Sequence, residues 1–484
     1  PGCDFYLKAD CLQKTGAFKL RGAYYKIATL SDEEKARGVI ACSAGNHAQG
    51  VALAARVLNC HATIFMPRST PEVKQTEVRR HGGRHVKIML HGDCYDETAA
   101  AAHEYTETHG CTFVHPYDDL VTMAGQGTLA DEVVMSGEGP FDRAYVAIGG
   151  GGLAASVACW LKKFWPRIKV IGVEGIDQAS MKTSIEQGRR VNLDYVDVFC
   201  DGTAVHIPGE LTYPLCRELV DEFVTVTNNE VCQAIRAMWE SSRVVPEPSG
   251  AMSLAGFLKQ WNRGEVKPEE KSFVVISGAN MDFTHLTQIA RQAGIGNHET
   301  RYLRISMDSK RGQVLKYLRH IPQDTTLVDV QYGKTEGNTQ HPVFGIAASD
   351  EDLDTIRTTL KKKGIEFEDI SEDDDVRFRM IHYQPELCQH PLFVHIEFPE
   401  RAGAFLDFME RIADLASLCY FNYTYTGERV GRALVGMEFD TAEDRETIRK
   451  RMGAFSKNII RSIREISPEA FQRIMGSRQL TGNH

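Results

Sequence analysis

Apolar residues in the first part of the chain come in short runs that are separated by stretches of helical spacing. The runs are Gly38–Cys42, Ala62–Pro67, His85–Leu90, Val170–Gly175 and Ser272–Asn280, and Ala144–Leu161 reads as a strand, a glycine loop and a helix. Short apolar runs that alternate with helices are typical of a parallel sheet covered by helices. We therefore predict one large α/β domain over residues 1–298.

Beyond residue 298 the pattern changes, and one segment of the chain repeats. Ile305–Ile321 aligns without a gap with Ile396–Ile412, at the offset of 91 residues that separates Ile305 from Ile396. The alignment places Gly312 on Gly403 and continues beyond both segments. Chance similarity is a poor explanation for a match of this length, so we interpret it as an internal repeat.

Each copy of the repeat carries the spacing of a small α+β unit. Apolar residues change from every second position to the helical period within both copies. We expect strand, glycine turn, helix, strand, strand and helix in each, which is the ferredoxin-like arrangement. The predicted units occupy residues 301–382 and 392–476, with a linker near Tyr383–Pro391.

The bulk composition narrows the class of protein. With 484 residues, 42% hydrophobic and 25% charged, the chain is expected to fold into several globular domains. Its formal charge is −9 and no basic run occurs, which argues against nucleic acid and anionic membranes as partners. Four glycines interrupt the uncharged stretch Ala144–Leu161, so no membrane span is expected there.

Cysteine usage and the first residue bear on the compartment. The twelve cysteines stand singly, with no CxxC pair, which suits a reducing compartment and predicts neither disulfides nor a metal site. We expect the cytoplasm, or an organelle matrix if the source is a eukaryote. The sequence begins at Pro1 and not at Met, so an N-terminal segment is expected to be missing.

Three loops of small residues each follow an apolar strand. They are Ser43–Gly50, Gly149–Leu153 and Ile276–Asn280, the last of which places Ser277 at the crevice end of its strand. Small residues between a strand and a helix leave backbone N–H groups free to bind an anion. The four glycines can wrap a phosphate closely, but they match neither the NTPase loop nor the dinucleotide fingerprint.

A lysine in the first helical segment completes a candidate site. Lys19 stands in the stretch QKTGAFKLRGA, and alone it would be interpreted as a solvated surface charge. Together with a glycine-bound phosphate and a hydroxyl, a lysine suggests pyridoxal phosphate held as a Schiff base.

The motifs KTGAFKLRGA, SAGNHAQGVA, GGGGLAASVA, EPSGA and SGAN occur in this order along the chain. This series resembles the pyridoxal-phosphate-dependent serine/threonine dehydratases of the tryptophan-synthase β fold, known as fold type II. The tail resembles the paired ACT-like regulatory domains of biosynthetic threonine dehydratases, so the resemblance spans nearly the whole chain.

The resemblance implies a role for each matching residue. Lys19 would form the Schiff base and remove the α-proton, with Phe18 beside it at the cofactor. The implied cofactor contacts are Gly149, Gly150, Gly151, Gly152 and Leu153 to the phosphate, Asn46 to the phenolic oxygen and Ser277 to the ring nitrogen. The implied substrate-carboxylate site is Ser43, Ala44, Gly45 and His47. Simpler interpretations remain: Asn46 as a helix cap, Ser277 as a strand-end hydroxyl and His47 as a structural residue.

Several positions depart from the family pattern. Ala17 and Ala9 stand where serine and glutamate are common. Ala44 replaces the second serine that serine racemases use as the opposite-face base, so dehydration is expected and not racemisation. Ser180 stands where metal-dependent relatives carry an acid, which argues against a cation site at Glu174.

By resemblance, the activity is conversion of L-threonine to 2-oxobutanoate and ammonia in isoleucine biosynthesis. The implied effectors are isoleucine as inhibitor and valine as its antagonist, bound near Gly312 and Gly403, and the implied assembly is a homotetramer. Two alternatives remain open: a dehydratase for serine or 3-hydroxyaspartate, and an inactive amino-acid sensor.

Overall fold

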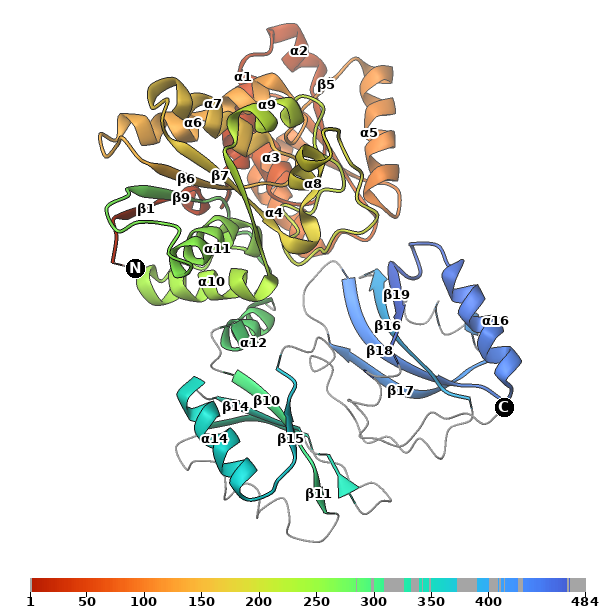
Figure 1. The fold of residues 1–484 in the computed structure, drawn as a ribbon. Coiled ribbons are helices and arrows are strands. Elements are labelled where there is room, and N and C mark those ends of the chain that lie inside the picture. The colour runs from red at the N-terminus through yellow and green to blue at the C-terminus, as the bar shows by residue number, and fades with distance from the viewer. Residues whose placement is uncertain are drawn as a thin grey trace. The chain divides into compact units, whose positions relative to one another are not determined.

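The chain divides into two compact units, Pro1–Phe283 and Thr284–His484 (Figure 1). The computed structural model describes residues 2–283, 285–296, 300–308, 326–331, 339–341, 343–347, 350–371, 390–399, 408, 411–412, 414–424, 430–467 and 470. Within these residues, no helix combines the length and the apolar character that crossing a membrane requires.

The first unit is built on two parallel sheets. The larger sheet has the order β1 (Phe5–Ala9), β9 (Ser272–Ile276), β6 (Arg143–Ala147), β7 (Lys169–Gly175) and β8 (Glu222–Val226). The smaller has the order β4 (Val86–Leu90), β3 (Ala62–Met66), β2 (Val39–Cys42) and β5 (Thr112–Phe113). The predicted α/β class is confirmed, whereas β1, β5 and β8 were missed.

Helices connect the strands of this unit and cover both sheets. They are α1 (Lys19–Ala28), α2 (Asp32–Arg37), α3 (Asn46–Val57), α4 (Glu72–Gly82), α5 (Tyr95–His109), α6 (Leu120–Met135), α7 (Gly152–Phe164), α8 (Ser180–Glu186), α9 (Thr212–Leu219), α10 (Asn228–Ser242) and α11 (Pro248–Asn262), with 3₁₀ turns η1 (Asp10–Leu12), η2 (Gly83–His85) and η3 (Ile176–Gln178). Small residues let α3 approach α1 closely, since a Cβ on Gly50 would lie 3.1 Å from the Leu20 backbone. The start of α3 is thereby held beside the start of α1.

Each sheet has its own apolar core. Leu129, Val146, Leu161 and Phe273 belong to the core of the larger sheet, and Val51, Ile64 and Val78 to that of the smaller. All five residues of β6 and of β9 are buried, as expected of parallel strands covered on both faces.

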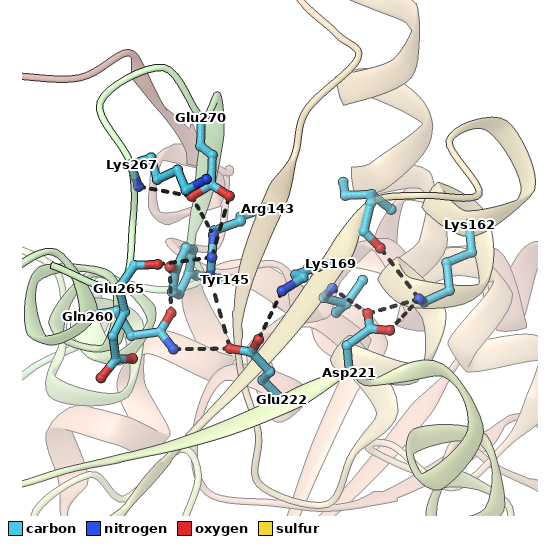
Figure 2. A network of polar contacts seen from close by, with 12 residues as sticks. Arg143, Tyr145, Lys162, Lys169, Asp221, Glu222, Gln260, Glu265, Lys267 and Glu270 are labelled. Atoms are coloured by element: carbon cyan, nitrogen blue, oxygen red, sulfur yellow. Dashed lines mark hydrogen bonds and ion pairs between the residues drawn. The ribbon is translucent and has the colours of Figure 1, made fainter. Parts of the chain in front are cut away.

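A network of charged side chains lies at the amino ends of β6, β7 and β8 (Figure 2). Arg143 is buried, and its Nε lies 3.1 Å from Glu270 Oε2. Tyr145 donates to Gln260 at 2.7 Å, and Gln260 donates to Glu222 at 3.1 Å. The polar groups that begin these strands are therefore paired with one another.

The second unit contains two antiparallel sheets of the same strand order. The first is β12 (Thr326–Gln331), β14 (Val343–Ala347), β10 (Thr300–Ile305) and β15 (Phe367–Asp369), and the second is β17 (Ser417–Thr424), β18 (Val430–Glu438), β16 (Leu392–Pro399) and β19 (Ser462–Glu465). The remaining elements are α12 (His285–Gly296), β11 (Met307–Asp308), β13 (Thr339–Gln340), α14 (Asp350–Lys362) and α16 (Ala442–Gly453). If the four strands of each sheet are numbered in chain order, both sheets place them side by side in the order 2-3-1-4.

This shared order agrees with the repeat that the sequence predicts. Each sheet packs on its own core, around Leu303 and Ile356 in the first copy and Val394 and Ile448 in the second. Gly312, Gly403 and most of the expected linker lie outside the described residues.

Candidate active site

Lys19 is the first residue of α1, and a short backbone pairing places it at the carboxyl end of β9. The Phe18 N–H donates to Ser277 O at 3.0 Å, and the backbone of residues 16–18 pairs antiparallel with that of residues 277–279. Carboxyl ends of parallel strands are where α/β proteins bind ligands. The pairing therefore brings Lys19, Phe18 and Ser277 together, as the sequence predicts.

The Lys19 side chain is not a solvated surface charge. Its amine is half-buried and donates to Pro116 O at 2.6 Å. Burial lowers the pKa of Lys19 to about 8, against the opposing charge of Glu247. Because a neutral amine is the nucleophilic form, this lysine is better suited to covalent chemistry than an exposed one.

The four-glycine loop links the end of β6 to the start of α7. Gly151 has φ +95°, in the left-handed region. A Cβ on Gly150 would lie 2.4 Å from the Tyr117 ring, and one on Gly149 would lie 2.9 Å from Thr203 Cα. Because neighbouring groups press against the loop from two sides, larger residues cannot replace these glycines without displacing it.

The carbonyl and amide groups of this loop differ in their partners. Gly150 O accepts from the Gly209 N–H at 3.3 Å and from Thr212 Oγ1 at 2.5 Å. Within the described residues, the N–H groups of Gly149, Gly150 and Gly151 donate to no backbone carbonyl. Free amides at the start of a helix form an anion site, so the predicted phosphate site has the donors it needs.

Asn46 is the first residue of α3, but its side chain does not cap the helix. The N-cap position is Gly45, which makes no side-chain cap. Asn46 Nδ2 donates to Glu247 Oε1 at 2.7 Å, and Asn46 Oδ1 accepts from Asn280 Nδ2 at 2.6 Å. The helix-cap interpretation of Asn46 is therefore wrong, and the amide belongs to a side-chain network at the candidate site.

Glu247 is the residue immediately before α11, and it is only 4% exposed. Burial raises the pKa of Glu247 to about 8, which its hydrogen bond from Asn46 partly offsets. A Cβ on Gly278 would lie 2.1 Å from Glu247 Oε1. The segment EPSGA therefore both starts a helix and brings a buried carboxyl group close to Lys19.

The predicted substrate turn connects β2 to α3. Ser43 Oγ accepts from the Gly45 N–H at 3.2 Å, and Ala44 packs against the core of the smaller sheet. His47 is buried, and its Nε2 lies 2.7 Å from Val114 O. Burial lowers the pKa of His47 to about 3, so this imidazole is neutral at ordinary pH.

Ser277 is less accessible than its position at the strand end suggests. The residue is 5% exposed, because its backbone pairs both with Phe18 and with Gly250 O, which lies 3.3 Å from the Ser277 nitrogen. Ser277, which the sequence places at the crevice end of its strand, is therefore a buried residue. The contact to a cofactor ring nitrogen stays a prediction.

Comparisons with known proteins agree with this geometry. Residues 1–278 match the family described as pyridoxal-phosphate dependent enzyme, and residues 388–461 match the C-terminal regulatory domain of threonine dehydratase. The chain belongs to the family of pyridoxal-phosphate-dependent enzymes.

Relatives and solved structures narrow the group within this family. The chain is 36% identical to biosynthetic L-threonine dehydratase IlvA of Haemophilus influenzae, over 92% of this chain and 86% of that protein. The chain is 37% identical to the counterpart in Burkholderia multivorans, over 91% of this chain and 87% of that protein. The processed form of threonine deaminase isoform 2 from Solanum lycopersicum gives a TM-score of 0.58 at 42% identity, over 60% of this chain and 84% of that chain.

The residues at this edge fit the cofactor of the family on two observations. The Lys19 amine has a lowered pKa beside a buried carboxyl group, and the glycine loop leaves amides free for a phosphate. Pyridoxal phosphate requires a lysine for attachment and donors for its phosphate. Both parts are present.

Glu174, at which the sequence argues against a cation site, accepts hydrogen bonds from the start of a helix. Its two carboxyl oxygens accept from the N–H groups of Met181 and Lys182, both at 2.9 Å. Glu174 therefore caps the start of α8. Among the described residues, no cluster of three His, Cys, Asp or Glu side chains is arranged to hold a metal ion.

Sequence reasoning missed the segment that joins the lysine to the glycine loop. Pro116 O receives the Lys19 amine, Tyr117 covers Gly150, and Asp118 accepts from the N–H groups of Glu210 and Leu211, both at 2.8 Å. The available signal was the segment HPYDD, which follows a β-like run and precedes a helix. A strand of two residues gave too weak a pattern to identify it.

Proposed function

We propose that the chain is an L-threonine ammonia-lyase, which converts L-threonine to 2-oxobutanoate and ammonia with pyridoxal phosphate. The observation that carries the proposal is the half-buried Lys19 amine, which donates to Pro116 O. The next residue, Tyr117, packs against the glycine loop, whose amides at Gly149–Gly151 donate to no backbone carbonyl of the described residues. Identity of 36% and 37% to biosynthetic threonine dehydratases, over 92% and 91% of the chain, supports the choice of reaction.

When bound, pyridoxal phosphate acidifies the α-hydrogen of an attached amino acid by withdrawing electron density from Cα. Lys19 would hold this group and act as the base at Cα. An amine with a pKa of about 8 is mostly protonated at neutral pH, but its neutral fraction, about a tenth, is far larger than that of an ordinary lysine, and this neutral form can accept that proton. The β-hydroxyl then leaves with a proton as water, and hydrolysis releases ammonia, so that no oxidant or reductant is needed.

The other residues of the site would bind and orient. The amides of Gly149–Gly152 and Leu153 suit the cofactor phosphate, and the Ser277 hydroxyl suits its ring nitrogen. The Ala44 amide suits the substrate carboxylate, since it lies at the start of α3, near the positive end of the helix dipole. The Ser43 N–H donates to Phe65 O at 3.1 Å and the Gly45 N–H to Ser43 Oγ at 3.2 Å, so these two residues would shape the turn around the carboxylate. The neutral His47 would shape this cradle without adding charge.

Dehydration is favoured over racemisation by a single position. Racemisation needs a proton donor on each face of Cα, and Ala44 offers none opposite Lys19. The complete set of Lys19, Asn46, Ser277 and the glycine loop also argues against an inactive sensor.

The second unit would provide control by amino acids. Residues 388–461 match a regulatory domain, and a ligand that prefers one packing of such a unit can shift activity. We propose isoleucine as inhibitor and valine as its antagonist, in a homotetramer located in the cytoplasm or in an organelle matrix. Fungal relatives named mitochondrial, such as that of Schizosaccharomyces pombe, are consistent with the latter.

The test is 2-oxo acid formation from L-threonine, L-serine and 3-hydroxyaspartate by cofactor-loaded protein, with and without isoleucine. We expect L-threonine to give the highest kcat/KM, and isoleucine to raise the threonine concentration needed for half-maximal rate. Absence of turnover with all three substrates in loaded protein would overturn the assignment.

A further inference from the structure

The side chains around Asn46 form a row of hydrogen bonds with acceptors at both ends. Asn280 Nδ2 donates to Thr15 O at 2.5 Å and to Asn46 Oδ1 at 2.6 Å. Asn46 Nδ2 in turn donates to Glu247 Oε1 at 2.7 Å. The row therefore runs from the Thr15 carbonyl, through two amides, to a buried carboxyl group.

The ends of this row fix the orientation of both amides. A backbone carbonyl only accepts, so Asn280 must present its NH₂ group to Thr15 and to Asn46. Asn46 must then present its oxygen to Asn280 and its NH₂ group to Glu247. An NH₂ group carries two hydrogens, and within the described residues the second hydrogen of Asn46 has no acceptor.

Two glycines make room for this arrangement. A Cβ on Gly278 would lie 2.1 Å from Glu247 Oε1, and one on Gly16 would lie 2.8 Å from Asn280 Oδ1. Side chains at these positions would push the carboxyl and the amide aside. The row is therefore held by close packing as well as by hydrogen bonds.

We propose that Glu247 is a positioning residue, which holds the Asn46 amide so that its remaining N–H is available to the cofactor's phenolic oxygen. The inference rests on the proposed function and deepens it. Since the hydrogen bond from Asn46 needs an acceptor and not a charge, a glutamine at position 247 should serve, whereas a methionine of similar length should not.

The experiment measures cofactor affinity by titration of the apoprotein and the visible absorption of the loaded protein. We expect Glu247→Met to weaken binding about tenfold and to shift the absorption maximum, and Glu247→Gln to stay within about twofold of wild type. Asn46→Ala should weaken binding by a similar factor. Adding Glu247→Met to Asn46→Ala should cause no further loss, because Glu247 acts through Asn46.

The opposite results would overturn the proposal. If Glu247→Gln weakens binding as much as Glu247→Met, the charge beside Lys19 matters and not the orientation of the amide. If the losses in the double variant multiply, Glu247 does not act through Asn46. Should Glu247→Met not fold, Asn280→Ala removes the other anchor of Asn46, and unchanged cofactor affinity there would equally overturn it.

Two features separate this result from failure of the proposed function. Neither affinity nor absorption depends on threonine turnover, so loaded protein that is inactive still gives the answer. Glu222→Gln, which removes a carboxylate from the amino ends of the strands, is the matched control and should leave both readings unchanged.

Discussion

In the larger parallel sheet, the polar groups at the amino ends of the strands and those at the carboxyl ends differ in their partners. At the amino ends, Arg143, Glu222 and Glu270 are charged groups that pair with one another (Figure 2). At the carboxyl ends, the Lys19 amine and the Glu247 carboxyl lie in surroundings that disfavour their charges. In the part of the chain that the structure describes, the N–H groups of Gly149–Gly151 have no backbone partner. Unsatisfied groups thus collect where a ligand would satisfy them.

The directions of the pKa shifts follow the same division. Partial burial opposes the charge on Glu270, but hydrogen bonds from the Lys267 N–H and Arg143 hold its pKa below the usual range. For Glu247, burial outweighs its hydrogen bonds and raises the pKa to about 8. The amino edge therefore supports the fold, whereas the carboxyl edge is arranged for chemistry. Changes at one edge should leave the function of the other intact.

The largest expected effect comes from Lys19→Ala. Loss of the attachment point and of the base should lower turnover of L-threonine by about 10³-fold or more. Cofactor absorbance should not survive desalting. The free energy of unfolding should stay the same or rise, because a half-buried amine is removed. Lys169→Ala, an exposed lysine at the amino edge, is the control and should retain full activity.

Gly150→Ala should strongly impair cofactor binding. Its Cβ would lie 2.4 Å from the Tyr117 ring, so either the loop or the ring must move, and we expect at least about tenfold weaker binding in a titration of the apoprotein. Gly127→Ala is the matched control, since its Cβ would meet nothing closer than 3.8 Å. Equal behaviour of the two variants would contradict the tight packing of the loop.

Arg143→Ala, at the amino edge, should lower the stability of the protein and leave its function unchanged. Removing the buried guanidinium leaves Glu270 without the cation at 3.1 Å, whereas Glu222 keeps Lys169 at 3.4 Å. We expect a loss of about 2 kcal/mol in unfolding free energy. Cofactor affinity and kcat at low temperature should be unchanged. Chemical denaturation and activity assays measure both quantities, and a loss of activity without a loss of stability would contradict the division between the edges.

The smallest expected effect concerns pH and Glu174. Burial raises the pKa of this carboxyl from 4.5 to about 8, against hydrogen bonds from Lys182 and Met181. Between pH 4.5 and about pH 8 the native carboxyl therefore keeps a proton that the unfolded chain has released. The free energy of unfolding falls as pH rises through this window. In Glu174→Gln this decline should flatten.

Thermal unfolding from pH 5 to pH 8 measures the difference. The glutamine offers an acceptor to only one of the two helix N–H groups, so the variant should be less stable at pH 5 and approach wild type towards pH 8. A difference that stays constant or widens from pH 5 to pH 8 would show that Glu174 is ionised in the native state.

Much of the fold could be predicted because its signals are local. Apolar runs identified β2, β3, β4, β6, β7 and β9, whereas β8 was missed because its residues, EFVTV, are largely half-buried and begin with Glu222. The repeat was visible because both copies keep the same apolar positions, and the two sheets share one strand order.

The candidate site was only partly predictable, since its groups are joined by contacts between distant parts of the chain. Lys19 and the glycine loop have recognisable sequence neighbourhoods. The row from Thr15 through Asn280 and Asn46 to Glu247 connects four separate segments. No spacing in the sequence indicates that these segments meet.

The attachment of the cofactor to Lys19 can be tested directly. Protein loaded with pyridoxal phosphate is reduced with borohydride, digested and mapped by mass spectrometry. The account predicts one modified peptide, which carries the pyridoxyl group on Lys19. Modification of a different lysine, or none in protein that remains folded, would contradict it.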